Sequence, residues 1–201
     1  NANAVKYRFD PNAAKAVLAN QKQTAPLRLV TLKSPEFLAA AKLIQQQLAG
    51  VGVNVVVIDA DVTTLQQNYI RARNYDMLLY GQNLGADPDV YSFWHSSQAD
   101  DPGLNVSNYK SPEADKQLES ARLSRDPKMR ATKFAAFVDT WAKDAPAMLI
   151  YSPAYLYGQD VRVEGVSAKK ITEPSDRFYG IEQWFVRREK ILKRDVGPDL
   201  P

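Results

Sequence analysis

His95 is the single histidine of the chain and the side chain best suited to acid–base chemistry near neutral pH. Ser96 and Ser97 follow it and Asp87 precedes it, so a nucleophile and an acid lie close by in the sequence. One interpretation is a hydrolase-like site. The other is a polar residue in a helical turn beside Trp94 that makes a structural hydrogen bond. The absence of a Gly-x-Ser-x-Gly motif favours the structural interpretation.

Four acidic residues near this histidine could bind a hard cation such as calcium: Asp87, Asp89, Asp100 and Asp101. Pro88 interrupts the first pair, and no glutamate closes a calcium-binding loop, so we interpret them as loop acids and helix caps. Gly81 and Gly85 lack the Gly-Lys-Ser/Thr ending of a phosphate-binding loop. We therefore expect neither a metal nor a cofactor.

Composition indicates a globular protein. The 201 residues are 45% hydrophobic and 24% charged, which suits a folded core rather than a disordered chain. The net charge of +3 comes from the segment 187–194, which has five basic residues and one acid, so the body is not a basic nucleic-acid surface. With no cysteine, disulfides and thiolate chemistry are excluded, and no apolar run is long enough to span a membrane.

The first half predicts three strands separated by two helices. The strands are expected at 27–33, 51–59 and 75–81 because each is short, apolar and rich in β-branched residues or bounded by Pro and Gly. A helix over 35–49 is predicted between Ser34 as its cap and Gly50 as its stop, and a second over 62–72. This alternation predicts an α/β fold with a βαβαβ, mostly parallel sheet flanked by helices.

The second half is predicted to be mainly helical. Ser111-Pro112 and Asp126-Pro127 each start a helix, and Pro146 ends the second one. The residues expected to face inward are Ala114, Leu118, Ala121, Phe134, Phe137, Val138, Trp141 and Ala145. We further expect a strand at 148–151, short β structure at 161–166, and an aromatic segment at 178–186 that returns to the sheet. One domain over 1–186, followed by a basic tail at 187–201, is the simplest organisation.

The segment 75–98 is the best candidate for a ligand site, because a buried strand runs there into a polar loop and then an aromatic turn of helix. In α/β domains, ligands bind at the loops that follow the carboxyl ends of the strands. Gln82 and Asn83 stand first in this loop and can both donate and accept hydrogen bonds, which suits peptide groups or sugar hydroxyls.

A series of short blocks resembles the extracellular solute-binding proteins of family 5, the peptide, oligopeptide and nickel receptors of ABC importers. Residues 7–18 resemble the family pattern Y-x-F-D-P-x-x-A-K-x-L-L, and 52–55 resemble G-I-x-V. Residues 75–89 resemble a strand, then Gly, then D-P-D, and 105–121 resemble N-x-x-x-Y-x-N-P-x-x-D-x-L-x-x-A. Further matches lie at 27–49, 126–130, 144–147 and 163–165, so the ordered set covers about residues 7–185.

The resemblance implies the carboxyl-terminal lobe of a type II periplasmic-binding-protein fold, and we expect the chain to be part of a longer protein. It implies a non-enzymatic, substrate-binding component of an ABC importer that holds a peptide or similar small polar solute between two lobes. The implied partners are that ligand, the amino-terminal lobe and the transporter's permease subunits, with no nucleic acid. The implied location is extracellular or periplasmic, with a lipoprotein-type membrane anchor on the full-length protein.

The ligand-binding residues that we predict are Gln82, Asn83, Leu84 and Asp87 in the loop, with a supporting wall of Trp94, Asn105 and Tyr109. The chain departs from the family at two places. Gln82 stands where the family usually has Trp, and the acid that captures the α-amino group in peptide-binding members would fall near Leu84 and Gly85. Asp87 could substitute for that acid, or it could belong only to the D-P-D helix start.

Two other classes of function stay open at this stage. A hydrolase using His95 requires a serine or water within hydrogen-bond reach of its ring and access to a cleft. A protein-interaction module requires a large exposed apolar patch. Within the transport interpretation the sequence leaves peptide, nickel chelate and oligosaccharide as alternative ligands.

Overall fold

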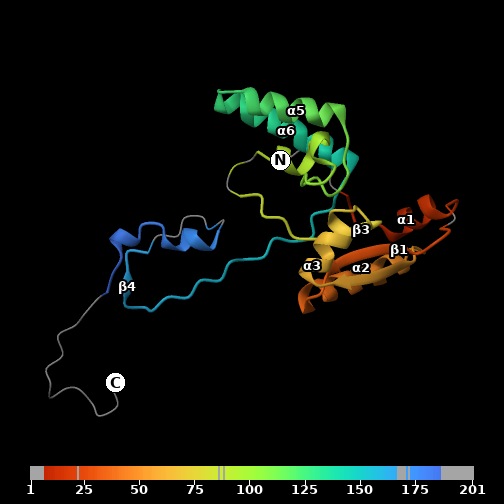
Figure 1. Ribbon diagram of the computed structural model, residues 1–201, viewed down its shortest axis with the longest axis horizontal. Helices are drawn as coiled ribbons and strands as arrows, with labels where there is room; N and C mark the ends of the chain where they lie inside the picture. The colour runs from red at the N-terminus through yellow and green to blue at the C-terminus, as the bar shows by residue number, and fades with distance from the viewer. Residues whose placement is uncertain are drawn as a thin grey trace, which may run out of the picture. The chain divides into compact units, whose positions relative to one another are not determined.

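The computed structural model describes residues 7–21, 23–85, 87, 89–166, 171 and 173–186. The chain divides into two compact units, 1–148 and 149–201. Figure 1 traces both units in chain order. The predicted basic tail at 187–201 lies outside the described residues, and the division into one lobe and a tail stays a prediction.

A three-stranded parallel sheet forms the first part of unit 1. Strand β1 (Leu27–Leu32) lies between β2 (Val55–Ala60) and β3 (Met77–Leu79), and Leu29 stands opposite both Val57 and Met77. Successive side chains of β1 point to opposite faces of the sheet. Leu29 packs with Ala41 and Val55 on one face, while Val30 packs with Ala60, Leu65 and Ile70 on the other. The predicted α/β fold with a parallel sheet is confirmed.

Helix α2 (Pro35–Ala49) covers the face of Leu29. It begins as predicted, with the Ser34 hydroxyl accepting the Phe37 amide at 3.4 Å and Pro35 in the first helical position. Ala41 is fully buried, and Ile44 and Leu48 pack around it. A small residue at the centre of the apolar stripe lets this helix approach the sheet closely.

The opposite face is covered by a helix that changes type. The predicted α-helix over 62–72 is wrong in detail: α3 (Val62–Thr64) is a single turn, and η1 (Leu65–Ile70) is a π-helix. The amide of Arg71 donates to the Gln66 carbonyl at 3.0 Å, and that of Asn74 to the Tyr69 carbonyl at 2.9 Å. Because these bonds span five residues, Leu65 and Ile70 are the buried pair, and Ala72, predicted to continue the apolar phase, is exposed.

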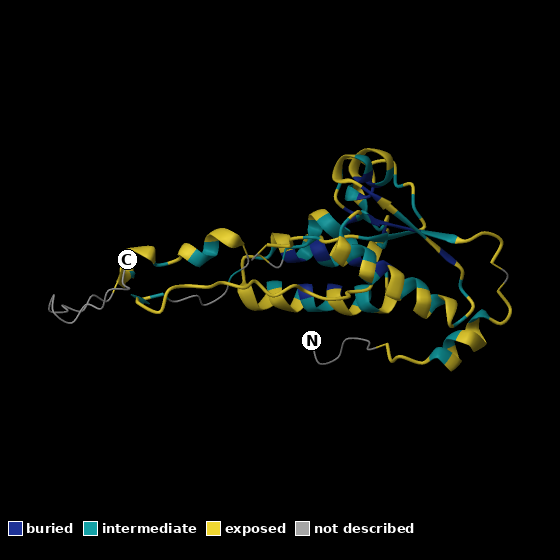
Figure 2. Cartoon of the chain, turned by 90° about the horizontal axis from the view of Figure 1, so that it is seen from below, coloured by how far each residue is buried: buried dark blue, intermediate teal, exposed yellow. Residues whose placement is uncertain are grey.

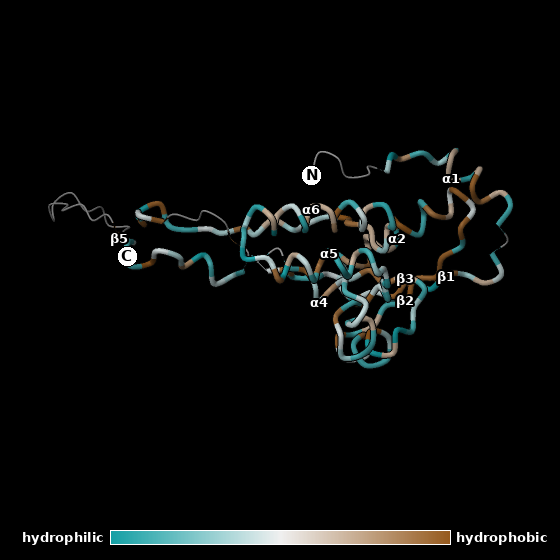
Figure 3. Tube along the Cα trace, turned by 90° about the horizontal axis from the view of Figure 1, so that it is seen from above, coloured by the Kyte–Doolittle hydropathy of each residue, from teal (hydrophilic) through white to brown (hydrophobic). Residues whose placement is uncertain are grey.

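Two longer helices form the second part of unit 1. Helices α5 (Pro112–Leu123) and α6 (Pro127–Asp144) run side by side (Figures 1 and 3), with Ala114, Leu118 and Phe137 buried between them. Helix α4 (Tyr91–Trp94) and the 3-10 turn η2 (Ser96–Gln98) pack on this pair. Figure 2 shows the buried positions concentrated on the inward faces of these elements.

Some predictions for this half are wrong. Val138 is 39% exposed, and Ala145 is exposed because it ends α6 in the left-handed conformation at φ 49°.

Helix α1 (Pro11–Leu18), which precedes the sheet in the chain, has no buried residue. No helix of the described part of the chain is both long and apolar enough to cross a membrane.

Unit 2 has little regular structure. Strand β4 (Val163–Glu164) pairs antiparallel with β5 (Phe185–Val186), and two 3-10 turns, η3 (Pro174–Phe178) and η4 (Ile181–Gln183), precede β5. The predicted strand at 148–151 is wrong, and the predicted return of 178–186 to the parallel sheet is replaced by pairing with β4. An apolar run forms a strand only where its backbone can pair with the edge of a sheet. Among the described residues, 148–151 pairs with no strand.

Candidate functional site

The loop after β3 borders a pocket of about 610 Å³. Three segments line it: the helix over 62–73, the loop at 80–83, and the turn at 101–106, with Phe93 beside them. Thr31 fixes the end of β3 at this place, because its fully buried hydroxyl donates to the Leu79 carbonyl at 3.0 Å. The pocket thus lies at the carboxyl end of a parallel strand, the position that the sequence predicts for a ligand.

Gln82 and Asn83 both line this pocket, and the structure brings them together there. Asn83 also accepts the Gly85 amide at 3.0 Å, which folds the loop back on itself in an Asx turn. Leu84 is 43% exposed and is not among the lining residues. The part of these three residues in ligand binding stays a prediction.

Asp87 points instead toward the helices of unit 1. Its carboxylate lies 2.7 Å from the Arg130 guanidinium and accepts the Asp89 amide at 2.8 Å. The Asp89 amide and then Arg130 hold the pKa of Asp87 below its usual value. Asp89 pairs with Arg122 at 2.9 Å and accepts the amide of Tyr91, the first residue of α4, at 3.1 Å. Both acids therefore tie the loop to α5 and α6, and neither lines the pocket.

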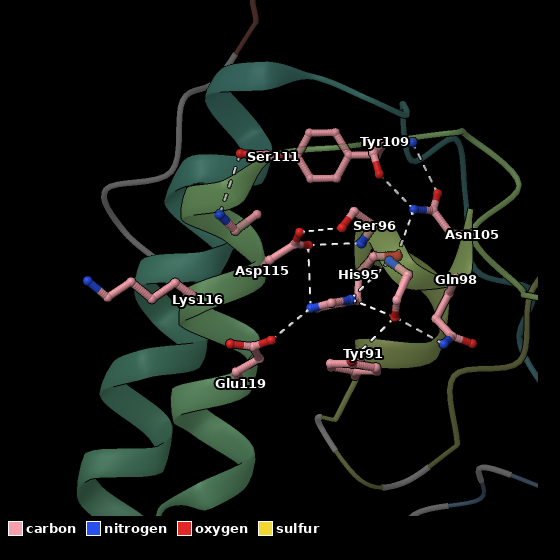
Figure 4. A network of polar contacts seen from close by, with 12 residues as sticks. Tyr91, His95, Ser96, Gln98, Asn105, Tyr109, Ser111, Asp115, Lys116 and Glu119 are labelled. Carbon is pink, nitrogen blue, oxygen red and sulfur yellow. Dashed lines mark hydrogen bonds and ion pairs between the residues drawn. The ribbon is translucent and has the colours of Figure 1, made fainter. Parts of the chain in front are cut away.

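Asn105 is fully buried behind the pocket wall. Its amide group donates to the carbonyls of His95 and Tyr109 at 3.1 and 2.8 Å (Figure 4). Its oxygen accepts the Tyr109 amide at 3.2 Å and the Ser107 hydroxyl at 3.0 Å. Because all four hydrogen-bonding positions have partners, Asn105 can support its neighbours Leu104 and Val106, which line the pocket, but has no capacity left for a ligand.

Tyr109 and Trp94 belong to the core between the helices. The Tyr109 hydroxyl donates to Asp144 at 2.6 Å, and burial together with this bond raises the pKa of Tyr109 to about 12. Trp94 packs edge-on against Trp141, with ring centroids 5.2 Å apart. Neither residue lines the pocket, so the structure separates this predicted wall from Gln82 and Asn83.

Arg73, which the sequence did not indicate, holds the turn at 101–106. Its guanidinium donates to the carbonyls of Ala99 at 3.0 Å, Gly103 at 2.8 Å and Ile70. Arg73 has φ 49°, a conformation that turns the chain out of η1. Arg71 and the amides of Gln66 and Gln67 also line the pocket. The signal for these residues in the sequence is the polar face of the helical segment that follows the second strand.

His95 lies in a network between η2 and α5 (Figure 4). Its Nδ1 lies 2.8 Å from the Ser97 hydroxyl and accepts the Ser97 amide at 3.1 Å, while Nε2 lies 3.3 Å from Glu119. Tyr91 stacks on the ring with 4.0 Å between centroids. Although a serine and an acid flank the ring, His95 is only 7% exposed, and it lines neither the pocket at 80–83 nor the hollow beside Arg122 and Arg130. The arrangement caps η2 and joins it to α5.

A second hollow of about 630 Å³ lies near the start of α6 and is lined by Arg122, Arg125 and Arg130. Two of these arginines hold Asp87 and Asp89. Among the described residues, no group of three His, Asp or Glu side chains is placed to hold a metal ion.

No family model matches the chain. A curated relative is the oligopeptide-binding protein AppA of Bacillus subtilis (strain 168), 28% identical over 149 residues, which are 74% of this chain and 26% of the relative. The chain thus spans about a quarter of that relative's length.

Solved structures share the fold. That of AppA from Bacillus subtilis in complex with a nonapeptide has a TM-score of 0.71 at 24% identity, covering 92% of this chain and 39% of that chain. NikZ from Campylobacter jejuni in complex with Ni(L-His) has a TM-score of 0.71 at 19% identity, covering 92% and 40%. DppA from Helicobacter pylori, an ABC transporter-associated periplasmic binding protein in complex with peptide STSA, has 0.68 at 24%, covering 94% and 36%. AppA is an oligopeptide-binding protein and DppA is a periplasmic binding protein.

Proposed function

We propose that the chain belongs to the family 5 solute-binding proteins and is one lobe of the substrate-binding component of an ABC importer, because it matches oligopeptide-binding relatives over part of their length. In this proposal the lobe is the carboxyl-terminal one, and a peptide or similar small polar solute binds in the cleft between it and a second lobe. The observation that carries the proposal is the pocket at the carboxyl end of β3, bordered by Gln82 and Asn83.

The pocket has the features of a solute site. Carboxamides can satisfy both the donors and the acceptors of a desolvated polar ligand, and the walls from Phe93 and Val106 supply apolar contact. Closure of a second lobe would bury the ligand from the other side and add the remaining contacts. The proposed partners are therefore that lobe and the permease subunits of the transporter. The proposed location is periplasmic or extracellular, with the full-length protein anchored to the membrane.

The protein-interaction alternative has one supporting observation. Large apolar side chains are exposed along 149–186, among them Leu149 at 82%, Leu156 at 91% and Tyr179 at 71%. In the transport proposal, a second lobe of the same protein would cover such side chains, so the same observation is compatible with that proposal.

The test is ligand binding by the full-length protein that contains this chain. Thermal-shift screening with peptides, oligosaccharides and nickel–histidine complexes should find a solute that raises the melting temperature, since a ligand that binds only the folded state stabilises it. Gln82→Ala and Asn83→Ala should each weaken that solute roughly 3- to 10-fold in calorimetric titration, the effect of one lost hydrogen bond.

Gln46→Ala, at an exposed position of α2 away from the pocket, is the matched control and should leave the affinity unchanged. If no solute of any class shifts the melting temperature, the proposed function is wrong. If both pocket variants bind as tightly as the original protein, the solute lies elsewhere.

A further inference from the structure

We infer that the neutral carboxamide side chains of this pocket bind polar groups of the solute, and that the pocket also recognises a carboxylate of the solute. It does not recognise an ammonium group of the solute. The inference rests on the proposed function and goes further by stating the charge of the solute's recognised end. It follows from which charged groups border the pocket and which of them already have partners.

The charges bordering the pocket are mostly positive. Its lining includes Arg71 and Arg73, and Asp101 is the single carboxylate among the described lining residues. Asp101 lies 3.2 Å from Nε of Arg71, so its charge is already paired. An ammonium group in this pocket would therefore find no free carboxylate and would face a net positive charge.

The positive charge of Arg73 is not neutralised by a carboxylate of the described residues. Its guanidinium donates to the carbonyls of Ala99, Gly103 and Ile70, and no described carboxylate forms an ion pair with it. Carbonyl dipoles satisfy its hydrogen bonds but do not cancel its charge. The residue is only partly exposed, so solvent screens this charge less than it would on an open surface.

Arg71 provides the group that could contact the ligand. Its Nε is bonded to Asp101, whereas its two terminal nitrogens make no hydrogen bond with a described residue. A guanidinium edge of this kind presents two parallel donors, the geometry that matches a carboxylate. Arg71 is also 59% exposed on its side chain, so it can turn toward a bound solute.

The acids of the neighbouring loop are committed elsewhere. Asp87 bonds to Arg130 at 2.7 Å and Asp89 to Arg122 at 2.9 Å, which directs both carboxylates toward α5 and α6. Releasing either one to bind an amine would break an ion pair and detach the loop. The remaining polar lining consists of neutral groups, chiefly the carboxamides of Gln66, Gln67, Gln82 and Asn83.

The experiment compares three probes on the full-length protein by calorimetric titration: trialanine, N-acetyl-trialanine and trialanine amide. Acetylation should change Kd less than 3-fold, because no group in the pocket binds the amine. Amidation of the carboxyl end should weaken binding 10-fold or more. Arg71→Gln should remove most of this preference for a free carboxylate, whereas Arg125→Gln, at an exposed arginine of the second hollow, should preserve it.

A 10-fold loss on acetylation, or equal binding of the acid and the amide, would overturn the inference and leave the proposed function standing. Binding of none of the three peptides would also overturn it, even if another solute binds. Failure of every solute in the wider screen would remove the proposed function as well, so the two failures are distinguishable.

Discussion

Replacement of Asn105 with alanine is expected to lower the free energy of unfolding by about 3–5 kcal/mol, because it removes a fully buried group with four hydrogen-bonded partners. The amide and the carbonyl of Tyr109 would both lose this partner in a buried environment, and an unsatisfied buried polar group costs about 1–3 kcal/mol. Urea denaturation followed by circular dichroism measures the change.

Two variants sharpen this prediction. Asn105→Asp keeps the shape and the acceptor oxygens but places a carboxylate oxygen against the carbonyls of His95 and Tyr109, so it should be at least as destabilising as alanine. Asn12→Ala, at an exposed position in α1, should change stability by less than about 0.5 kcal/mol. A loss below about 1 kcal/mol for Asn105→Ala would contradict the structural role assigned to this residue.

Gly103→Ala is expected to destabilise the protein by about 3 kcal/mol and to distort the pocket. A Cβ at this position would lie 2.2 Å from the carbonyl oxygen and 2.5 Å from the carbonyl carbon of Gln98. Because these are backbone atoms of Gln98, they cannot rotate away from the added Cβ. The same carbonyl oxygen also accepts the backbone amide of Asn105 at 3.0 Å. The turn at 101–106 would have to move, and the carbonyl of Gly103 that binds Arg73 would move with it.

The measurement combines urea denaturation with titration of the solute identified by screening, in which a loss of affinity should accompany the loss of stability. Gly158→Ala is the control, because nothing lies within 4 Å of its added Cβ. Unchanged stability and affinity in Gly103→Ala would show that the turn relaxes freely and does not define the pocket.

The sequence predicted the parallel sheet well because its signals are local and redundant. Leu27–Leu32 is a short apolar run, Ser34 and Pro35 mark the next helix start, and the alternation of strands and helices limits the topology. The same reasoning missed the π-helix, since an apolar pattern at 62–72 does not reveal that the backbone bonds span five residues. Where an apolar run met no partner strand, as at 148–151, the predicted strand did not form.

The candidate site was predictable only in part. The position of Gln82 and Asn83 followed from their place after a strand. The sequence could not show that every hydrogen-bonding position of the Asn105 side chain has a partner, because one partner is the carbonyl of His95, which only the fold brings close. For the same reason, the sequence left Asp87 as a possible acid for an amine, whereas the structure pairs it with Arg130, far away in the chain.

The most direct test of the central claim is hydrogen–deuterium exchange on the full-length protein, with and without the solute that most raises its melting temperature. We predict that bound solute slows exchange of backbone amides at 80–83 and in the turn at 101–106, the two segments beside Gln82 and Asn83 in the pocket. Protection confined to 122–134, around the second hollow, or no protection at either place, would contradict the assignment of this pocket as the solute site.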